Sequence, residues 1–324
     1  MANFIVEPSA LTSMFLSGEL PTRSTVIHLL ENVQKILAAE STIIRATLKG
    51  RSKFHVVGDI HGQFFDLQNG IFKKCGYPSP TNAFVFNGDI VDRGSWGIEC
   101  LLLLLAWKFK YPQDMFLTRG NHESEALTTR YGFKDECIHK YDKKIYKLCL
   151  KTFCCLPLGV ILDDHTFIVH GGLVSKNMGN VSLEELNRIH RFREPSHDKG
   201  DLMMEMLWSD PMENLNGIEP NNRGGNTIMF GPDITNNFCK LNNLKRVIRS
   251  HQVVEQGILS HHNSKLFTIF SAPNYCDSRG NIGSVIIFDS NGKMDYIQFE
   301  ASNHPDIPPM AYQKKMKKKV MSKM

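Results

Sequence analysis

Five short clusters of acidic, histidine and asparagine residues hold most of the side chains in this 324-residue chain that could bind a metal or catalyse a reaction. They read GDIHG at 58–62, GDIVDRG at 88–94, RGNHE at 119–123, HGG at 170–172 and RSH at 249–251. Each follows a short apolar run, as a loop follows a buried strand. One such cluster alone is more often a helix cap or a structural hydrogen-bonding group. Five in equivalent positions indicate a shared site.

Six side chains in these clusters offer oxygen or imidazole donors without any thiolate: Asp59, His61, Asp89, Asn121, His170 and His251. This donor set suits manganese, iron or zinc. Six protein ligands are too many for one catalytic ion that keeps an open position. We therefore expect two divalent ions, manganese first, with iron or zinc as alternatives. Asp89 follows the middle strand of the first three and is the carboxylate expected to bridge the two ions.

Two ions about 3.5–4 Å apart clamp the oxygens of an in-line displacement and lower the pKa of a shared water. Arg93 lies close to Asp89 in sequence, so its guanidinium could make paired hydrogen bonds to the oxygens of a phosphate bound at the ions. His122 follows Asn121 directly and can protonate the leaving oxygen, with Asp92 orienting the imidazole and raising its pKa. The pattern predicts phosphoester hydrolysis by direct attack of a metal-bridging water, without a covalent intermediate.

The apolar runs that precede the clusters predict the elements that position them. KFHVV, AFVF and MFLT are separated by helical patterns at 64–74 and 98–109, and this spacing of about 30 residues is that of a βαβ unit. Consecutive crossovers place the carboxyl ends of the strands at one sheet edge, where α/β proteins bind ligands. Later runs (TFIV, LKRVI, LFTIF, SVIIFD) have less helix between them. We expect an α/β sandwich of two packed mixed β-sheets flanked by helices.

Three segments divide the chain. Residues 1–50 read as an amphipathic helical segment, with a helix start at Pro21, Thr22 and Ser24. Residues 51–313 form the expected catalytic core. Residues 314–324 form a basic tail with six lysines, without which the formal charge falls from +5 to −1. Such a tail is usually solvated, so we expect no nucleic-acid partner; a nucleic-acid or acidic-membrane contact is the alternative.

Composition excludes several classes of protein. With 42% hydrophobic and 22% charged residues, the chain suits a globular core and not a disordered, collagen-like or coiled-coil protein. The longest apolar run, 100–107, is too short to span a membrane. Eight cysteines show no CxxC pair and no disulfide spacing, which favours reduced thiols. We expect a cytoplasmic location, with the nucleus as a second compartment.

The motif series resembles the PPP family of metal-dependent serine/threonine protein phosphatases. The resemblance rests on GDIHGQ, GDIVDRG, RGNHE, HGGL and SAPNYCD, in this order over residues 50–300, supported by LWSDP at 207–211 and FGPDIT at 230–235. The closing HPDIPPMAY at 304–312 is similar to the type-5 branch. The N-terminal tetratricopeptide repeats of that branch are absent from these residues, which fits either a catalytic portion or a form without that autoinhibition.

The resemblance implies residue roles. One metal would be held by Asp59, His61 and Asp89, and the other by Asp89, Asn121, His170 and His251. Arg93 and Arg223 would contact phosphate, the Asp92–His122 pair would act as the acid, and Tyr275 would lie over the cleft. Arg249 is either a further phosphate contact or a structural partner behind His251. Phosphoserine and phosphothreonine proteins are the implied substrates, and regulatory proteins are further implied partners.

The sequence departs from the family pattern at two places. NNRGGN around Arg223 has an extra glycine, and Trp96 replaces a smaller aromatic residue.

Two other functions compete with protein dephosphorylation. One competing function is hydrolysis of nucleotides or other small phosphoesters at the same metals. The other is a scaffold whose site has decayed, which the intact donors and His122 argue against.

Overall fold

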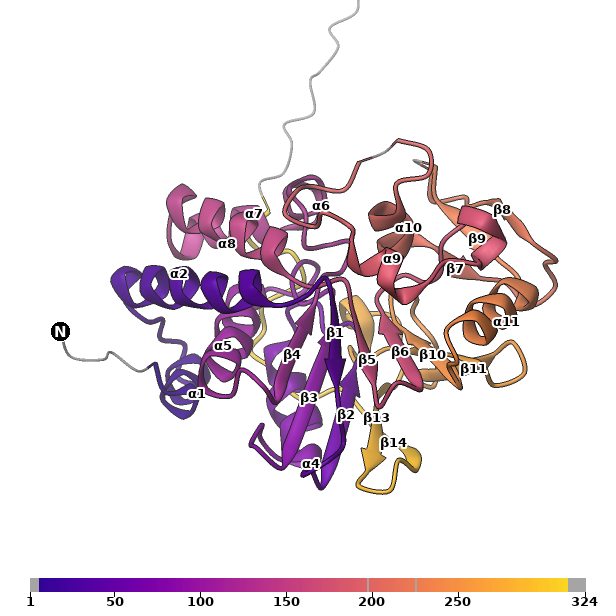
Figure 1. Ribbon diagram of the computed structural model, residues 1–324. Coiled ribbons are helices and arrows are strands. Elements are labelled where there is room, and N and C mark those ends of the chain that lie inside the picture. The colour runs from indigo at the N-terminus through magenta and orange to yellow at the C-terminus, as the bar shows by residue number, and fades with distance from the viewer. Residues whose placement is uncertain (1–5, 197, 225, 314–324) are drawn as a thin grey trace, which may run out of the picture.

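Two large β-sheets pack face to face, with helices on both outer faces (Figure 1). The computed structural model describes residues 6–196, 198–224 and 226–313. The expected α/β sandwich of two mixed sheets is confirmed. The predicted basic tail, 314–324, lies outside the described residues.

The five-stranded sheet has the order β14-β13-β2-β3-β4. Its strands are β2 (Lys53–Val57), β3 (Asn82–Asn87), β4 (Met115–Thr118), β13 (Gly283–Asp289) and β14 (Met294–Phe299). The first three are parallel neighbours in chain order, as the βαβ spacing predicted. β13 pairs antiparallel with β2, and β14 antiparallel with β13. The carboxyl ends of β2, β3 and β4 therefore lie side by side.

The six-stranded sheet has the order β1-β5-β6-β10-β12-β11. Its strands are β1 (Ile43–Ala46), β5 (Gly159–Leu162), β6 (Thr166–Val169), β10 (Arg246–Arg249), β11 (Ile258–His261) and β12 (Leu266–Ile269). β6, β10 and β12 were predicted from their apolar runs and run parallel to one another. β1 corrects the helical expectation for 1–50: helix ends at Ala39, and Arg45 is exposed between buried neighbours, which is a strand pattern.

Alternation along the strands builds separate cores on the two faces of the five-stranded sheet. In β3, Ala83 and Val85 pack in the cluster between the two sheets, whereas Phe84 and Phe86 pack toward the helices. The opposite sheet contributes Ile168 and Ile248 to the same inter-sheet cluster. A one-residue slip of β3 would exchange both sets of side chains, so this packing fixes the register that places the loop after β3.

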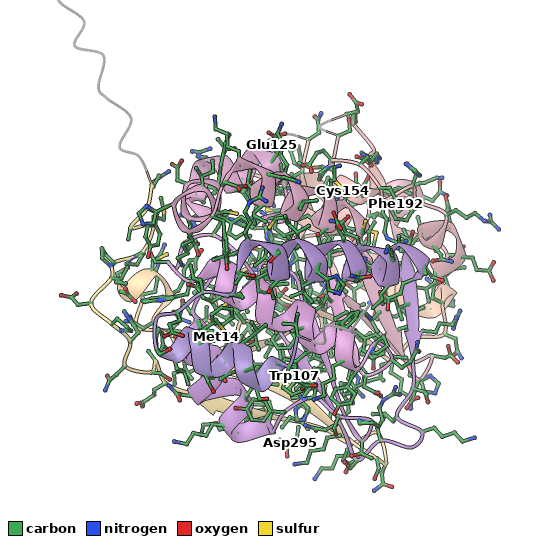
Figure 2. The ribbon with its side chains drawn as sticks, turned by 90° about the vertical axis from the view of Figure 1, so that its left-hand side faces the viewer. Met14, Trp107, Glu125, Cys154, Phe192 and Asp295 are labelled. Atoms are coloured by element: carbon green, nitrogen blue, oxygen red, sulfur yellow. The ribbon has the colours of Figure 1, made fainter. Side chains whose placement is uncertain are left out.

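Helices cover both outer faces. The five-stranded sheet is covered by α1 (Pro8–Leu16), α2 (Arg23–Ala39), α5 (Gly97–Lys110), α7 (Phe133–Lys140) and α8 (Lys143–Cys155). Figure 2 views this helical layer, with Met14 of α1 and Trp107 of α5 below α2. α2 begins as predicted, because the Thr22 hydroxyl caps it by accepting a hydrogen bond from the Thr25 N–H.

The remaining elements complete the layers. α3 (Phe64–Asp66), η1 (Leu67–Phe72) and α4 (Lys73–Cys75) form the predicted helical stretch after β2, and α6 (Glu125–Tyr131) follows β4. The six-stranded sheet is covered by α9 (Leu183–Asn187), α10 (Leu202–Trp208), α11 (Pro232–Leu241) and a small sheet of β7 (Asp210–Pro211), β9 (Ile228–Phe230) and β8 (Ile218–Pro220). Short turns are η2 (Lys176–Gly179) and η3 (Tyr275–Asp277). Within the described ranges, no helix combines the length and apolarity required to cross a membrane.

Candidate active site

The predicted donors come together where strands of both sheets end. Asp59 and His61 follow β2, Asp89 follows β3 and Asn121 follows β4, all in the five-stranded sheet. His170 follows β6 and His251 follows β10 of the six-stranded sheet. The sequence placed all clusters at one sheet edge; the structure corrects this, because the site lies on a rim shared by two sheets.

The loops that carry these donors are tightly constrained. His61, Asp89 and His251 all have left-handed backbones, with φ of 43°, 50° and 70°. Such conformations cost free energy in non-glycine residues and persist only where the surroundings enforce them. Gly88, with φ of 83°, packs on Gly120: a Cβ at Gly88 would lie 2.5 Å from the Gly120 Cα. Glycine is therefore required where the loops after β3 and β4 meet.

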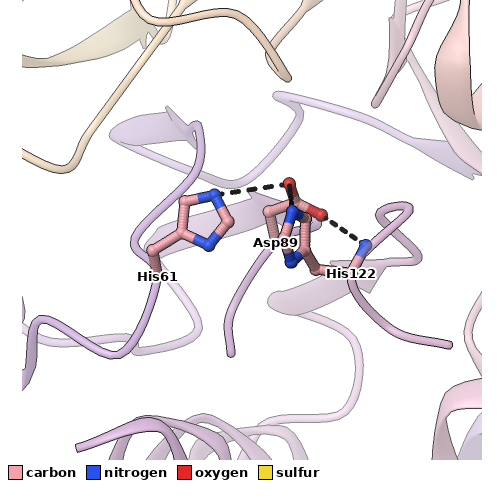
Figure 3. A group of neighbouring side chains, drawn as sticks. All are labelled: His61, Asp89 and His122. Atoms are coloured by element: carbon pink, nitrogen blue, oxygen red, sulfur yellow. Dashed lines mark hydrogen bonds and ion pairs between the residues drawn. The ribbon is translucent and has the colours of Figure 1, made fainter. Parts of the chain in front are cut away.

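His61 and two carboxylates form the first donor group. His61 Nε2 lies 3.5 Å from Asp89 Oδ2 and 3.7 Å from Asp59 Oδ2. The other ring nitrogen, Nδ1, donates to the Val91 carbonyl at 2.9 Å, which leaves the Nε2 lone pair facing the carboxylates. Figure 3 shows His61, Asp89 and His122 converging. This is the tautomer that a metal-binding histidine requires.

The second donor group also includes Asp89. His170 Nε2 lies 3.3 Å from Asp89 Oδ1, and His170 Nδ1 donates to the Asn87 carbonyl at 2.8 Å. The Asn121 amide places one terminal atom 2.9 Å from both His170 Nε2 and His251 Nδ1. Asp89, His170 and His251 offer ligand atoms within 4.8 Å of one another. Asp89 alone belongs to both groups, which is the position that a bridging carboxylate would occupy.

The chemistry of this cluster fits divalent cations. Burial raises the pKa of Asp59 to about 7 and raises the pKa of Asp89 well above its usual range, with the two carboxylates repelling each other. Burial also lowers the pKa values of His61, His170 and His251 and so favours their neutral, ligating forms. Close carboxylates beside neutral imidazoles form an electronegative cage, and bound cations would relieve its repulsion.

His122 and Asp92 form a buried pair beside this cage. His122 Nδ1 lies 2.7 Å from Asp92 Oδ2, and Asp92 Oδ1 accepts a hydrogen bond from the Phe133 N–H at 3.0 Å. The other nitrogen, Nε2, faces Asp89 Oδ2 at 4.0 Å. Burial lowers the pKa of His122, and the nearby Arg93 lowers it further, whereas burial raises the pKa of Asp92. A negatively charged group bound beside Arg93 would offset this and favour the protonated imidazole.

The three predicted arginines have different environments. The Arg93 guanidinium lies 3.8 Å over the Tyr131 ring and faces the cleft, and its Nε has no partner among the described residues. Arg223 also lines the cleft and pairs with Asp210. Arg249 is fully buried and donates to the Gly171 and Ser209 carbonyls and to Asp210. Its expected phosphate contact is therefore not supported, and the structural alternative describes it better.

These groups enclose a cleft of about 440 Å³. It is lined by Asp59, His61, Asp89, Asn121 and His251 of the donor groups and by Arg93, His122, Tyr131, Trp208, Arg223, Tyr275 and Arg279. The Tyr275 ring lies 5.1 Å from the His61 ring and forms the wall expected over the cleft. His170 and Asp92 lie just behind the surface, bonded to residues that line it.

One functional residue escaped the sequence interpretation. Glu123 is fully buried, and its carboxylate accepts hydrogen bonds from the main-chain N–H groups of Asp89, Ile90 and Gly120 at 2.8–2.9 Å. It therefore ties the loops after β3 and β4 together and orients Asp89. Its only signature in the sequence was its place directly after His122, because bonding to main-chain groups has no residue spacing of its own.

Comparison with known proteins shows which family this chain resembles. Residues 52–255 match the calcineurin-like phosphoesterase family. Serine/threonine-protein phosphatase T of Schizosaccharomyces pombe is 46% identical over 298 residues, covering 92% of this chain and 62% of that protein. Human serine/threonine-protein phosphatase 5 is 42% identical over 291 residues, covering 90% of this chain and 57% of that protein. The chain thus spans about three fifths of the length of these curated relatives.

Solved structures agree. A Saccharomyces cerevisiae protein serine/threonine phosphatase, described as similar to human phosphatase PP5, superposes with a TM-score of 0.89 at 37% identity, covering 95% of this chain and 100% of that one. A cold-active protein tyrosine phosphatase, at 17% identity and a TM-score of 0.55 over 81% of this chain and 82% of that one, shares the fold alone. The chain therefore belongs to the calcineurin-like phosphoesterase family and, within it, to the metal-dependent serine/threonine protein phosphatases related to phosphatase T and phosphatase 5.

Proposed function

We propose that residues 51–313 are the catalytic core of a protein phosphatase that hydrolyses phosphoserine and phosphothreonine in other proteins. The observation that carries the proposal is the placement of Arg93, Arg223 and the His122–Asp92 pair around the two donor groups in one cleft. The two curated relatives named above are serine/threonine-protein phosphatases, which supports the same substrate class. Regulatory proteins remain expected partners, and the free thiol state of all eight cysteines supports the expected cytoplasmic or nuclear location.

The donor groups would hold two divalent cations, one by Asp59, His61 and Asp89 and one by Asp89, Asn121, His170 and His251. Bound there, cations such as manganese, with iron or zinc as alternatives, would supply Lewis acidity and an activated water for direct displacement at phosphorus. A metal-binding histidine usually donates its other ring N–H to a fixed acceptor, which orients the ring. His61 and His170, one in each group, do so to main-chain carbonyls.

The chain's own residues bind the phosphate and supply the proton. Arg93 and Arg223 present guanidinium groups that match phosphate oxygens in geometry and charge. His122 Nε2 gives a proton to the departing serine or threonine oxygen, which would otherwise leave as a poor alkoxide. Asp92 accepts the hydrogen bond from His122 Nδ1, which keeps Nε2 aimed into the cleft and stabilises the imidazolium. Tyr275 and Tyr131 form part of the wall of the cleft.

The decisive experiment measures phosphate release from a phosphothreonine protein, with manganese or with chelator, beside the His122→Asn variant. We expect metal-dependent release and a loss of about 10²–10⁴-fold in kcat for the variant, with little change in KM, because general acid catalysis acts in the transition state. A variant with unchanged turnover would remove His122 from the acid role.

The same assay with a second substrate, together with metal analysis and a nucleic-acid binding measurement, separates the competing functions. Faster hydrolysis of diadenosine tetraphosphate than of the phosphoprotein would favour the small-phosphoester alternative. No bound metal and no hydrolysis with added manganese would favour the decayed scaffold. Salt-dependent nucleic-acid binding that is lost on truncation after Gln313 would instead give the lysine-rich tail a function of its own.

A further inference from the structure

The segment 308–313 lies outside the donor groups but is bonded to the loop that carries Arg93 and to the end of α6, which carries Tyr131. Its Met310 N–H donates to the Arg93 carbonyl at 2.8 Å, and its Gln313 side chain donates to the Arg130 carbonyl at 2.7 Å. The Met310 side chain also packs over the turn after Tyr131: a Cβ at Gly132 would lie 3.2 Å from Met310 Cγ. One segment thus fixes both members of the stacked Arg93–Tyr131 pair.

Ser95 connects this segment to the Arg93 turn. It is 1% exposed, and its hydroxyl donates to the Pro308 carbonyl at 2.7 Å and accepts from the Ala311 N–H at 3.1 Å. The Ser95 carbonyl accepts a hydrogen bond from Lys140 Nζ at 2.8 Å. Ser95 therefore uses both its side chain and its main chain in bonds within the protein, and none of these groups faces the cleft.

The backbone at Arg93 requires such support. Asp92 and Arg93 have φ of 71° and 69°, which are unfavourable conformations for residues with a side chain. The Arg93 N–H donates to the Tyr131 carbonyl at 3.0 Å, while the Arg93 carbonyl accepts from Met310. Both sides of this residue are therefore held by main-chain hydrogen bonds. The direction in which its guanidinium enters the cleft follows from this backbone.

We propose that Ser95 is a positioning residue that acts through segment 308–313 to hold Arg93 in its phosphate-binding conformation. The proposal rests on the proposed function, since it takes Arg93 as a phosphate contact. It also separates two roles within one turn. Asp92 is held by bonds to the Phe133 N–H and to His122, neither of which belongs to the segment, so loosening the segment should disturb phosphate binding more than proton transfer.

The first test is Ser95→Ala in the full chain. We expect KM for a phosphothreonine peptide and the competitive inhibition constant of inorganic phosphate both to rise about three- to tenfold, with kcat changing less than about twofold. Ser284→Ala is the matched control: Ser284 is also fully buried and also donates to a main-chain carbonyl, but on β13. A Ser284→Ala variant that matches Ser95→Ala in thermal stability should keep the wild-type inhibition constant.

A double-mutant cycle separates positioning from general destabilisation. If Ser95 acts through Arg93, Ser95→Ala adds no further rise in the phosphate inhibition constant once Arg93→Ala is present. Fold-changes that multiply in the double variant would overturn the proposal. If Arg93→Ala alone leaves the constant unchanged, the Arg93 part of the proposed function fails. If Arg93→Ala raises the constant and Ser95→Ala does not, only the positioning role fails.

A second variant approaches the same contact from the exposed side. Ala311→Pro removes the N–H that donates to Ser95, and a proline there disfavours the left-handed backbone of Met310, whose φ is 54°. Ala311 is exposed, so the core is left intact should Ser95→Ala fail to fold. We expect the same rise in the phosphate inhibition constant. A folded Ala311→Pro protein with wild-type constants would contradict the proposal.

Discussion

Asp89 is the residue on which both donor groups depend. It lies 3.5 Å from His61 Nε2 through one carboxylate oxygen and 3.3 Å from His170 Nε2 through the other. Asp59 lies 3.7 Å from His61 Nε2 but approaches only His170 Nδ1, the nitrogen that bonds to the Asn87 carbonyl. We expect Asp89→Asn to lower kcat on the order of 10³-fold, and Asp59→Asn about tenfold less severely, because loss of a bridge disturbs both ions.

The measurement is kcat at saturating manganese, together with the metal content of each purified variant. Asp89→Asn should lose both equivalents of metal, and Asp59→Asn mainly one. Equal, mild losses for the two substitutions would argue against Asp89 as the bridge. Unfolding curves for both variants serve as the control, since each removes a buried carboxylate.

At the scale of residues, the structure brings together the donors and the His122–Asp92 pair that the sequence singled out, while their roles stay predictions. They were recognisable because each belongs to a short polar cluster that follows an apolar run, and four of the five clusters contain glycine. Arg249 was not, because residue type cannot distinguish an arginine that lines a cleft from one buried behind it. Glu123 was missed because its carboxylate bonds to main-chain N–H groups, which leave no pattern in the side chains.

Among the elements, β2 carries a histidine that makes stability depend on pH. His55 is fully buried, stacks on Phe84 with 4.4 Å between ring centres, and lies 2.8 Å from Asn82 Oδ1 through Nε2. Burial lowers its pKa from 6.5 to about 4. Between these values the unfolded chain binds a proton that the folded chain does not, so His55 destabilises the fold as pH falls, by about 3 kcal/mol at pH 4.

His55→Gln removes this proton but retains a donor for Asn82. We expect the variant to lose less unfolding free energy than the parent between pH 6.5 and pH 4, as followed by urea unfolding at several pH values. His28→Gln controls for the loss of a histidine at an exposed position. Parallel pH profiles for the parent and His55→Gln would show that His55 titrates alike in the folded and unfolded states.

Elements were predictable where an apolar run led into a polar motif or where helical periodicity was long. The strands before the motifs and the helices at 64–74 and 98–109 were found in this way. β1 was not, because it follows α2 closely, Arg45 interrupts its apolar residues and no such motif comes after it. The small sheet of β7, β8 and β9 was missed because its strands have only two or three residues each.

For the molecule as a whole, cation binding and folding should be linked. Burial, together with repulsion from neighbouring carboxylates, raises the pKa values of Asp59 and Asp89, and keeping these groups charged in the folded chain opposes folding. Cations that bind only the folded chain would offset this cost. At a concentration of 100 times Kd, one bound ion adds about 2.7 kcal/mol. We expect manganese to raise Tm by several degrees and chelator to reverse this, as calorimetry would record.

In Asp89→Asn the manganese-dependent shift should largely disappear. Calcium, which prefers six to eight oxygen ligands, provides a comparison ion of equal charge and should shift Tm less. A shift that is equal for the parent and Asp89→Asn would place the stabilising ion elsewhere on the molecule.

The rim shared by two sheets has a consequence for protein synthesis. The donors are spread from residue 59 to residue 251, and the last one follows β10, a strand that pairs with β6 and β12. A growing chain on the ribosome can assemble β2, β3 and β4 early, yet the second donor group is incomplete until β10 has emerged. Under the proposed function, activity should therefore be acquired late and in one step, and chains released before residue 251 should be inactive.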